Sequence, residues 1–217
     1  MLAFFSLYKQ ICRIGHSKFC YNIIENNNRN DRSIKERIQT GNKAYYANLQ
    51  MLKSKIISRR SKLQIYKTLI RPVVTYGAET WMLTAVEKNA LRRFERKVLR
   101  KIYGPVVDKV VWPIRYNNEL CELIGGEDIV RFVKAQRIQW LSHVERMDET
   151  VMLKRVLKGK LYAMRRIGRP KIRWLEDVIT DLRRMGISGW MDGWMEKARN
   201  RDHWRRIVEE AKAHPGL

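Results

Sequence analysis

Apolar residues along most of this chain recur every three or four positions, the spacing that places side chains on one face of a helix. No stretch alternates apolar and polar residues as a half-buried β-strand does. The pattern therefore predicts an all-α protein with no substantial sheet, built as an irregular helical assembly.

The first two helices are expected in the N-terminal half of the chain. One apolar face predicts a helix over about 32–57. Its members are Ile34, Ile38, Tyr45, Leu49, Leu52 and Ile56. Ser61 can cap a second helix, and Pro72 must kink or end it because proline lacks the amide N–H. The apolar face of that helix consists of Leu63, Tyr66, Leu69 and Ile70.

The best-delimited element is a helix over 85–103. Thr84 and Glu87 have the spacing of a capping box, in which the hydroxyl and the carboxylate each accept a backbone N–H. Gly104 and Pro105 predict its end, because glycine can adopt a left-handed cap and proline cannot continue a helix. Its apolar face consists of Leu91, Phe94, Val98 and Ile102.

The second half of the chain carries four further helical patterns. A short helix is expected near 118–124 and a long one over about 127–147. A third pattern ends at Gly186, and Asp202 can cap a last helix. The apolar faces of these last two helices consist of Trp174, Val178, Leu182 and Met185, and of Ile207, Val208 and Ala211.

The net charge of +23 is distributed unevenly over the 217 residues. Residues 53–103 carry 14 basic and 3 acidic residues, and residues 151–175 carry 9 basic and no acidic ones. Unneutralised like charges destabilise a compact monomer unless an anion offsets them. The two blocks therefore predict a polyanionic partner, and nucleic acid is the expected one.

Six cations of the first block lie in two neighbouring rows on the helix 85–103. They are Arg92, Arg96 and Arg100, with Arg93, Lys97 and Lys101 beside them. Like charges at this spacing cost about 0.2–0.5 kcal/mol per pair in an isolated helix. Two interpretations stay open, a solvated face and a helix laid along a nucleic-acid backbone. The second is favoured because the whole block shares the basic bias.

The second block is expected to be a loop, because Gly159, Gly168 and Pro170 interrupt regular structure. A basic loop can follow phosphates, and a guanidinium can fork two phosphate oxygens or stack on a base. The candidate binding residues are Arg165, Arg166, Arg169, Lys171 and Arg173, followed directly by Trp174. For tryptophans on apolar faces core packing is favoured over base stacking, and Trp174 is the first one to test.

The sequence gives little support for a disulfide, a metal site, a membrane span or a phosphate-binding loop. Cys12, Cys20 and Cys121 show neither disulfide nor zinc spacing, which favours a reducing, intracellular compartment and leaves nucleus or cytoplasm open. Asp177 and Asp181 lie four apart on a predicted helix, where a solvated face is favoured over a shared metal. No run approaches the roughly 18 apolar residues of a membrane span, and no phosphate-binding glycine loop occurs. We expect no cofactor, no metal, no membrane association and no small-molecule substrate.

Four stretches carry a pattern that goes beyond periodicity. They are KLQIYKTLIRPVVTYGAETWMLTAVEKNALRRFERKVLRKIYGP (62–105), RIQWLSHVERM (137–147), GRPKIRW (168–174) and ARNRDHWRRIVEEAKAHPGL (198–217). In this order they resemble the region downstream of the polymerase palm in non-LTR retrotransposon reverse transcriptases, the jockey- and RTE-like elements of animals. The resemblance covers roughly residues 34–217.

The resemblance, together with the charge blocks, divides the chain into five parts. A thumb-like helical domain, the part that grips the template-primer duplex, is implied for 32–105. The other parts are a divergent N-terminal segment at 1–31, a helical connector at 106–150, the basic loop at 151–175 and a C-terminal helical region at 176–217.

The carboxylates that such a polymerase needs are not found in this sequence. Nucleotidyl transfer uses two divalent ions held by clustered carboxylates, and the family's hairpin reads Tyr-x-Asp-Asp. The nearest string, Tyr76-Gly77-Ala78-Glu79, offers a single carboxylate. The chain by itself is therefore not expected to be an enzyme, and no catalytic residue is assigned.

Three hypotheses follow. The leading one is a truncated, non-catalytic remnant of a retrotransposon reverse transcriptase that binds RNA, DNA or an RNA-DNA duplex nonspecifically through phosphates. In the second, the chain is the C-terminal part of an active endonuclease/reverse transcriptase that is completed by a separate palm in trans. In the third, it is a pseudogene product without a folded function.

Overall fold

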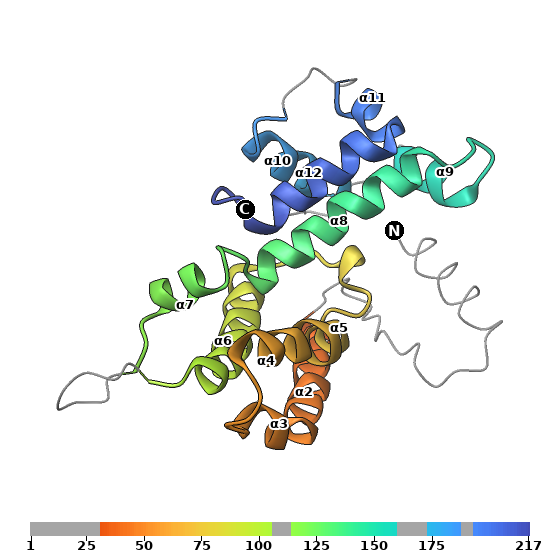
Figure 1. Cartoon of the computed structure of the whole chain (residues 1–217). Coiled ribbons are helices and arrows are strands. Elements are labelled where there is room, and N and C mark those ends of the chain that lie inside the picture. Colours follow the sequence, from red (N-terminus) through yellow and green to blue (C-terminus); the bar gives the residue numbers. More distant parts are fainter. Residues whose placement is uncertain (1–30, 106–113, 160–172, 188–192) are drawn as a thin grey trace.

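The computed structural model describes residues 31–105, 114–159, 173–187 and 193–217. All regular structure within these ranges is helical, and no strand occurs in them. The prediction of an all-α, irregular helical assembly is confirmed (Figure 1). None of the described helices is long and apolar enough to cross a membrane.

The prediction of one helix over 32–57 is wrong. The chain instead forms α2 (Asp31–Ala47) and α3 (Leu49–Lys53), which are separated at Asn48. The Asn48 side chain donates to the Ala44 carbonyl at 2.8 Å, the kind of local bond through which asparagine competes with regular helix. The backbone becomes extended at Ser54, and the Ser54 hydroxyl accepts the N–H of Ile56. Ile56 is consequently 96% exposed and not part of an apolar face.

The second helix begins earlier than predicted. Ser58, and not Ser61, caps α4 (Arg59–Ile65), because the Ser58 hydroxyl accepts the Ser61 N–H at 3.1 Å. A π-helical turn, η1 (Tyr66–Ile70), joins α4 to α5 (Arg71–Val74). The wider turn ends two residues before Pro72, close to the place where a kink is expected. It leaves Leu69 exposed, while Tyr66 and Ile70 are buried.

The prediction for α6 (Ala85–Tyr103) is confirmed at both ends. The Glu87 N–H donates to the Thr84 hydroxyl at 3.4 Å, and the Thr84 N–H donates to the Glu87 carboxylate at 2.6 Å. Gly104 ends the helix with a positive φ of 69°. All four residues of the predicted apolar face are buried, namely Leu91, Phe94, Val98 and Ile102.

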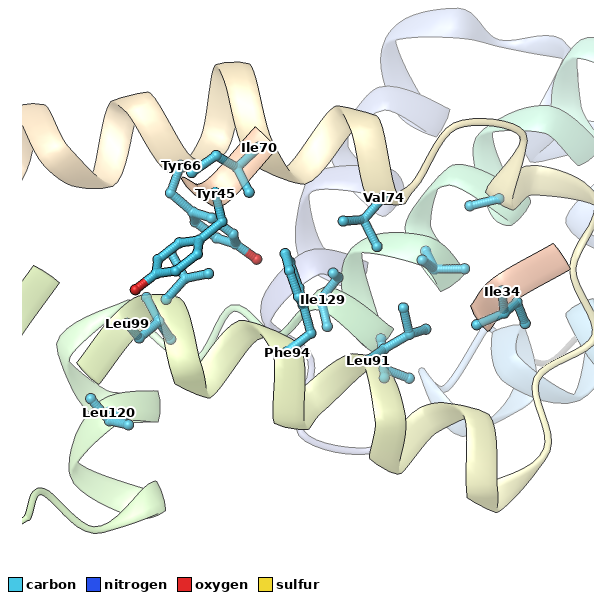
Figure 2. Close-up of a cluster of buried hydrophobic side chains, with 14 of the residues drawn as sticks. Ile34, Tyr45, Tyr66, Ile70, Val74, Leu91, Phe94, Leu99, Leu120 and Ile129 are labelled. Carbon is cyan, nitrogen blue, oxygen red and sulfur yellow. The ribbon is translucent and has the colours of Figure 1, made fainter. Parts of the chain in front are cut away.

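A first core lies between α2, α4, η1, α5 and α6. Figure 2 shows side chains from the η1 and α5 region facing those of α6, with Phe94 near the middle of this core. The 3-10 turn η2 (Ala78–Thr80) closes it with the fully buried Trp81. Gly41 allows α2 to approach α5, since a Cβ at this position would overlap Cγ2 of Val74.

The C-terminal half contributes the remaining helices. They are α7 (Asn117–Leu123), α8 (Ile129–Glu145), α9 (Met152–Lys158), α10 (Trp174–Arg184), α11 (Gly193–Arg199) and α12 (Arg201–Ala213). A second core lies between α8, α10, α11 and α12. The start of α8 packs in the first core through Val133 and its later turns pack in the second through Ile138, so this helix joins the two (Figure 1).

Two further predictions need correction. Residues 151–175 are not all loop, because α9 occupies Met152–Lys158; residues 160–172 lie outside the described part. Asp202 does not cap the last helix. Asn200 does, since its side-chain oxygen accepts the N–H groups of Asp202 and His203 at 3.1 and 3.0 Å. The predicted end of α10 is confirmed, with Gly186 at a φ of 72°.

Candidate nucleic-acid interface

The basic rows of α6 lie opposite its buried apolar face. Arg93, Lys97 and Lys101 are exposed, one turn apart, while Arg92, Arg96 and Arg100 beside them are partly buried. The helix has this orientation because its apolar residues must enter the first core, which leaves the other face to solvent.

Two of the predicted binding residues have structural partners. Arg92 forms an ion pair with Asp128, the N-cap of α8, with 2.6 Å between Nε and Oδ2. Arg100 donates to the Asn117 side-chain oxygen at the start of α7 at 2.9 Å. These contacts hold α6 against α7 and α8, and the carboxylate of Asp128 offsets the charge of Arg92.

Four further cations of α6 have no acidic partner in the described part of the chain. Among the described residues, no carboxylate forms an ion pair with Arg93, Arg96, Lys97 or Lys101. Arg93 donates through Nε to the carbonyl of Asn89 in its own helix. We name these four residues the α6 stripe.

Lys97 has surroundings that the sequence did not indicate. Its ammonium donates to the Asn42 side-chain oxygen at 3.0 Å and to the Tyr46 hydroxyl at 3.3 Å, both on α2. It also lies 4.9 and 4.7 Å from the ring centroids of Tyr45 and Tyr46. A helical wheel of α6 places Lys97 on the exposed row, but nothing local to either helix indicates that they meet here.

The second basic block is only partly described. Arg165, Arg166, Arg169 and Lys171 lie outside the described residues, so their predicted role stays a prediction. Arg173 is exposed and directly precedes α10; its N–H donates to the Glu176 carboxylate at 3.1 Å.

Trp174 is used in packing. Its indole N–H donates to the Glu79 carbonyl at 2.9 Å, and the ring is half-buried against the second core. The guanidinium of Arg137 lies 5.9 Å from the ring centroid. These contacts account for Trp174 without a bound base, and base stacking on it stays an untested prediction.

Two lysines at the start of the second block have structural contacts. The buried Lys154 ammonium donates to the carbonyls of Glu145 and Met147, each at 2.8 Å. It also pairs with Glu149 at 2.7 Å, and Lys158 pairs with both Glu145 and Glu149. A cation at a helix C-terminus is favourable, so these lysines stabilise the end of α8.

The expectation of a solvated face at Asp177 and Asp181 is wrong for Asp181, which is only 2% exposed. Asp181 pairs with Lys134 at 2.8 Å and with Arg137 at 3.7 Å. Asp177 pairs with Arg137 at 2.7 Å. No group of three or more potential metal ligands occurs in the described part of the chain, and the two acids hold α10 on α8.

Glu95 is a buried carboxyl group whose pKa is raised by its surroundings. It is 5% exposed and accepts the Tyr66 hydroxyl at 2.7 Å and the Ile129 N–H at 2.9 Å. Burial raises the pKa of Glu95 to about 7, although both hydrogen bonds act in the opposite direction. Because it lies inside the first core, it links α6 to η1 and to the first turn of α8.

Comparison with known proteins finds a distant similarity to a transposon-derived protein. The chain is 18% identical over 155 residues to an uncharacterized transposon-derived protein of Caenorhabditis elegans. The matched part is 70% of this chain and 56% of that protein, so the chain spans little more than half the length of its relative. No protein-family model and no solved structure matches the chain. The similarity supports a transposon-related origin.

Proposed function

We propose that this chain is a non-catalytic remnant of a non-LTR retrotransposon reverse transcriptase that binds nucleic acid nonspecifically through phosphates. The observation that carries the binding proposal is the α6 stripe. Arg93, Arg96, Lys97 and Lys101 lie outside the buried apolar face of α6, and no described carboxylate pairs with them.

The stripe has the chemistry of a phosphate contact and not of a base-specific one. Successive cations one helical turn apart are roughly 6 Å apart along the axis. Such a row can neutralise neighbouring phosphates and release their counterions, which supplies sequence-independent affinity. Phosphate contacts position a protein on a strand, whereas sequence is read at base edges.

The reverse transcriptase origin rests on the four quoted motifs, with support from a relative that is described as transposon-derived. A polymerase active site needs clustered carboxylates for two divalent ions. In the string Tyr76-Gly77-Ala78-Glu79, the Glu79 carbonyl accepts the Trp174 indole and the 3-10 turn closes the first core. That arrangement gives this string a packing role.

Salt dependence tests the binding proposal. The double variant Arg93→Gln/Lys101→Gln removes two cations of the α6 stripe. The slope of log K against log salt on duplex DNA should become less steep by about 1.8, because each lost phosphate contact contributes about 0.9. Fluorescence anisotropy of a labelled duplex over a salt series measures this slope.

The matched control is Arg205→Gln/Arg206→Gln, which removes the same charge from exposed positions of α12. Its slope should stay close to that of the unchanged chain. Binding that does not depend on salt, or no binding at low salt, would overturn the proposal. Primer extension by the chain alone would contradict its non-catalytic part.

A further inference from the structure

Tyr46 is an exposed aromatic residue that the structure holds in place. It lies at the end of α2 with 60% of its surface accessible. Its ring meets the buried Tyr45 ring edge-on, with 5.1 Å between centroids and 67° between planes. The edge-on contact with the buried Tyr45 ring restrains Tyr46 and gives its ring a defined position at the surface.

The ring lies directly beside the α6 stripe. The Lys97 ammonium bonds to the Tyr46 hydroxyl at 3.3 Å and to Asn42 at 3.0 Å. An ammonium has three N–H donors, so these two contacts leave one for a further acceptor. Arg93 lies one turn before Lys97 and Lys101 one turn after it, both exposed. The aromatic surface therefore has cations on either side along the helix.

This combination matches the chemistry of an unpaired nucleotide. Proteins that bind single strands combine a positively charged path for the backbone with aromatic rings on which bases stack. A duplex offers the phosphates but keeps its bases inside the stack. An exposed ring within a basic row consequently adds affinity only for strands whose bases are free.

We infer that Tyr46, with Lys97 and Asn42, forms a stacking site for an unpaired base of single-stranded nucleic acid, whose flanking phosphates contact Arg93 and Lys101. This inference rests on the proposed phosphate binding by the α6 stripe and deepens it, because it selects single strands over duplexes. Stacking uses the base and not the sugar, so both RNA and DNA strands are accepted.

The variant Tyr46→Ala tests the stacking site. It should weaken binding of a single-stranded oligonucleotide by about 5- to 150-fold, the range expected for one lost base–aromatic stack. Binding of a duplex of the same length should change less than about twofold. The salt slope on the single strand should stay unchanged, because no phosphate contact is removed. Anisotropy with single-stranded DNA, single-stranded RNA and duplex DNA measures all three quantities.

Two further variants make the test specific. Tyr46→Phe keeps the ring and should bind single strands within about twofold of the unchanged chain. Tyr76→Ala removes another accessible tyrosine, 42% exposed and 4.6 Å from the Arg37 guanidinium. Arg37 and Tyr46 are nine residues apart on α2, which places them on opposite faces of the helix. This control should leave single-strand affinity unchanged, and thermal unfolding should confirm that each variant is folded.

The outcomes separate the two proposals. If Tyr46→Ala weakens single strand and duplex equally, or neither, the stacking site is wrong while phosphate binding stands. Loss of affinity in Tyr46→Phe as large as in Tyr46→Ala also overturns stacking. If the unchanged chain binds no nucleic acid at low salt, the proposed function itself fails. A strand made only of abasic nucleotides should bind the unchanged chain and Tyr46→Ala equally well, and a difference between them would contradict the inference.

Discussion

Glu95 shows how one buried side chain links several elements. Its carboxylate accepts from Tyr66 in η1 and from the first N–H of α8, while its backbone belongs to α6. No cation forms an ion pair with it in the described structure, although Arg71 and Asp128 both act on it from a distance. The charged form is therefore stabilised by these two hydrogen bonds and by the more distant Arg71, and desolvation opposes it.

The raised pKa predicts a pH dependence of stability. The folded carboxyl binds its proton up to a pH of about 7, whereas the unfolded one releases it near 4.5. The folded state binds more protons between these values, so the free energy of unfolding should fall as pH rises from about 4.5 to 7. The loss attributable to this group is on the order of 3 kcal/mol.

The variant Glu95→Gln should remove this part of the pH dependence and be more stable than the unchanged chain at pH 8. The amide retains the shape of the carboxyl group, and its oxygen can accept the Ile129 N–H while Tyr66 accepts from its NH₂ group. Urea unfolding at several pH values measures the effect. Parallel pH profiles for the two proteins would show that Glu95 titrates normally.

At the scale of elements, the approach of α2 to α5 depends on Gly41. A Cβ there would overlap Cγ2 of Val74 and lie 3.2 Å from Cζ of Phe94. Both neighbours belong to the first core, where little space is left for a shift. This glycine is required by packing and not by its backbone conformation, because it lies inside a regular helix.

The variant Gly41→Ala should therefore be destabilised by about 1–3 kcal/mol, the usual cost of overpacking a core. Helix propensity alone predicts the opposite sign, a gain of about 1 kcal/mol. Adding Val74→Ala should recover part of the loss, since it removes the overlapping methyl group. Chemical unfolding of both single variants and the double variant gives the coupling energy. A stabilised Gly41→Ala would contradict the close packing of α2 on α5.

At the scale of the whole molecule, α8 belongs to both cores. Its first turns pack with α6, and its later turns pack with α11 and α12 (Figure 1). The buried Lys134 lies near the transition between the two cores and pairs with Asp181 of α10. Because one continuous helix supplies residues to both clusters, the two cores should unfold as one cooperative unit.

The variant Asp181→Ala tests this coupling. Leaving Lys134 buried without its partner should cost about 3–5 kcal/mol. Amide hydrogen exchange should then become faster in α6 of the first core as well as in α12 of the second. Asp177→Ala is the control, because its carboxylate is partly exposed and Arg137 still has Asp181 nearby. Faster exchange confined to α12 would show that the cores unfold independently.

Even where interactions between residues close along the chain decide an element, the sequence predicted some boundaries and missed others. The boundaries of α6 were predicted because Thr84, Glu87 and Gly104 act within one helical turn. The prediction of one helix over 32–57 failed because apolar spacing continues through Asn48, while bonds of the Asn48 and Ser54 side chains to nearby backbone decide the break. The cap at Ser58 was missed because Ser58 and Ser61, three residues apart, are both plausible caps, and the sequence does not decide between them; in the structure their hydroxyls are 2.9 Å apart.

In the candidate site, the range of the interactions separates what the sequence determined from what it did not. The sequence by itself determined the helical class, the position of α6 and the two rows of cations on it, since composition and helical period suffice for these. Only the tertiary structure decided that Asp128 neutralises Arg92, that Trp174 packs on Glu79, and that Tyr46 lies beside Lys97. These contacts join residues 36, 95 and 51 positions apart, and such distant pairs form only when the packing of apolar faces has set the places of the helices.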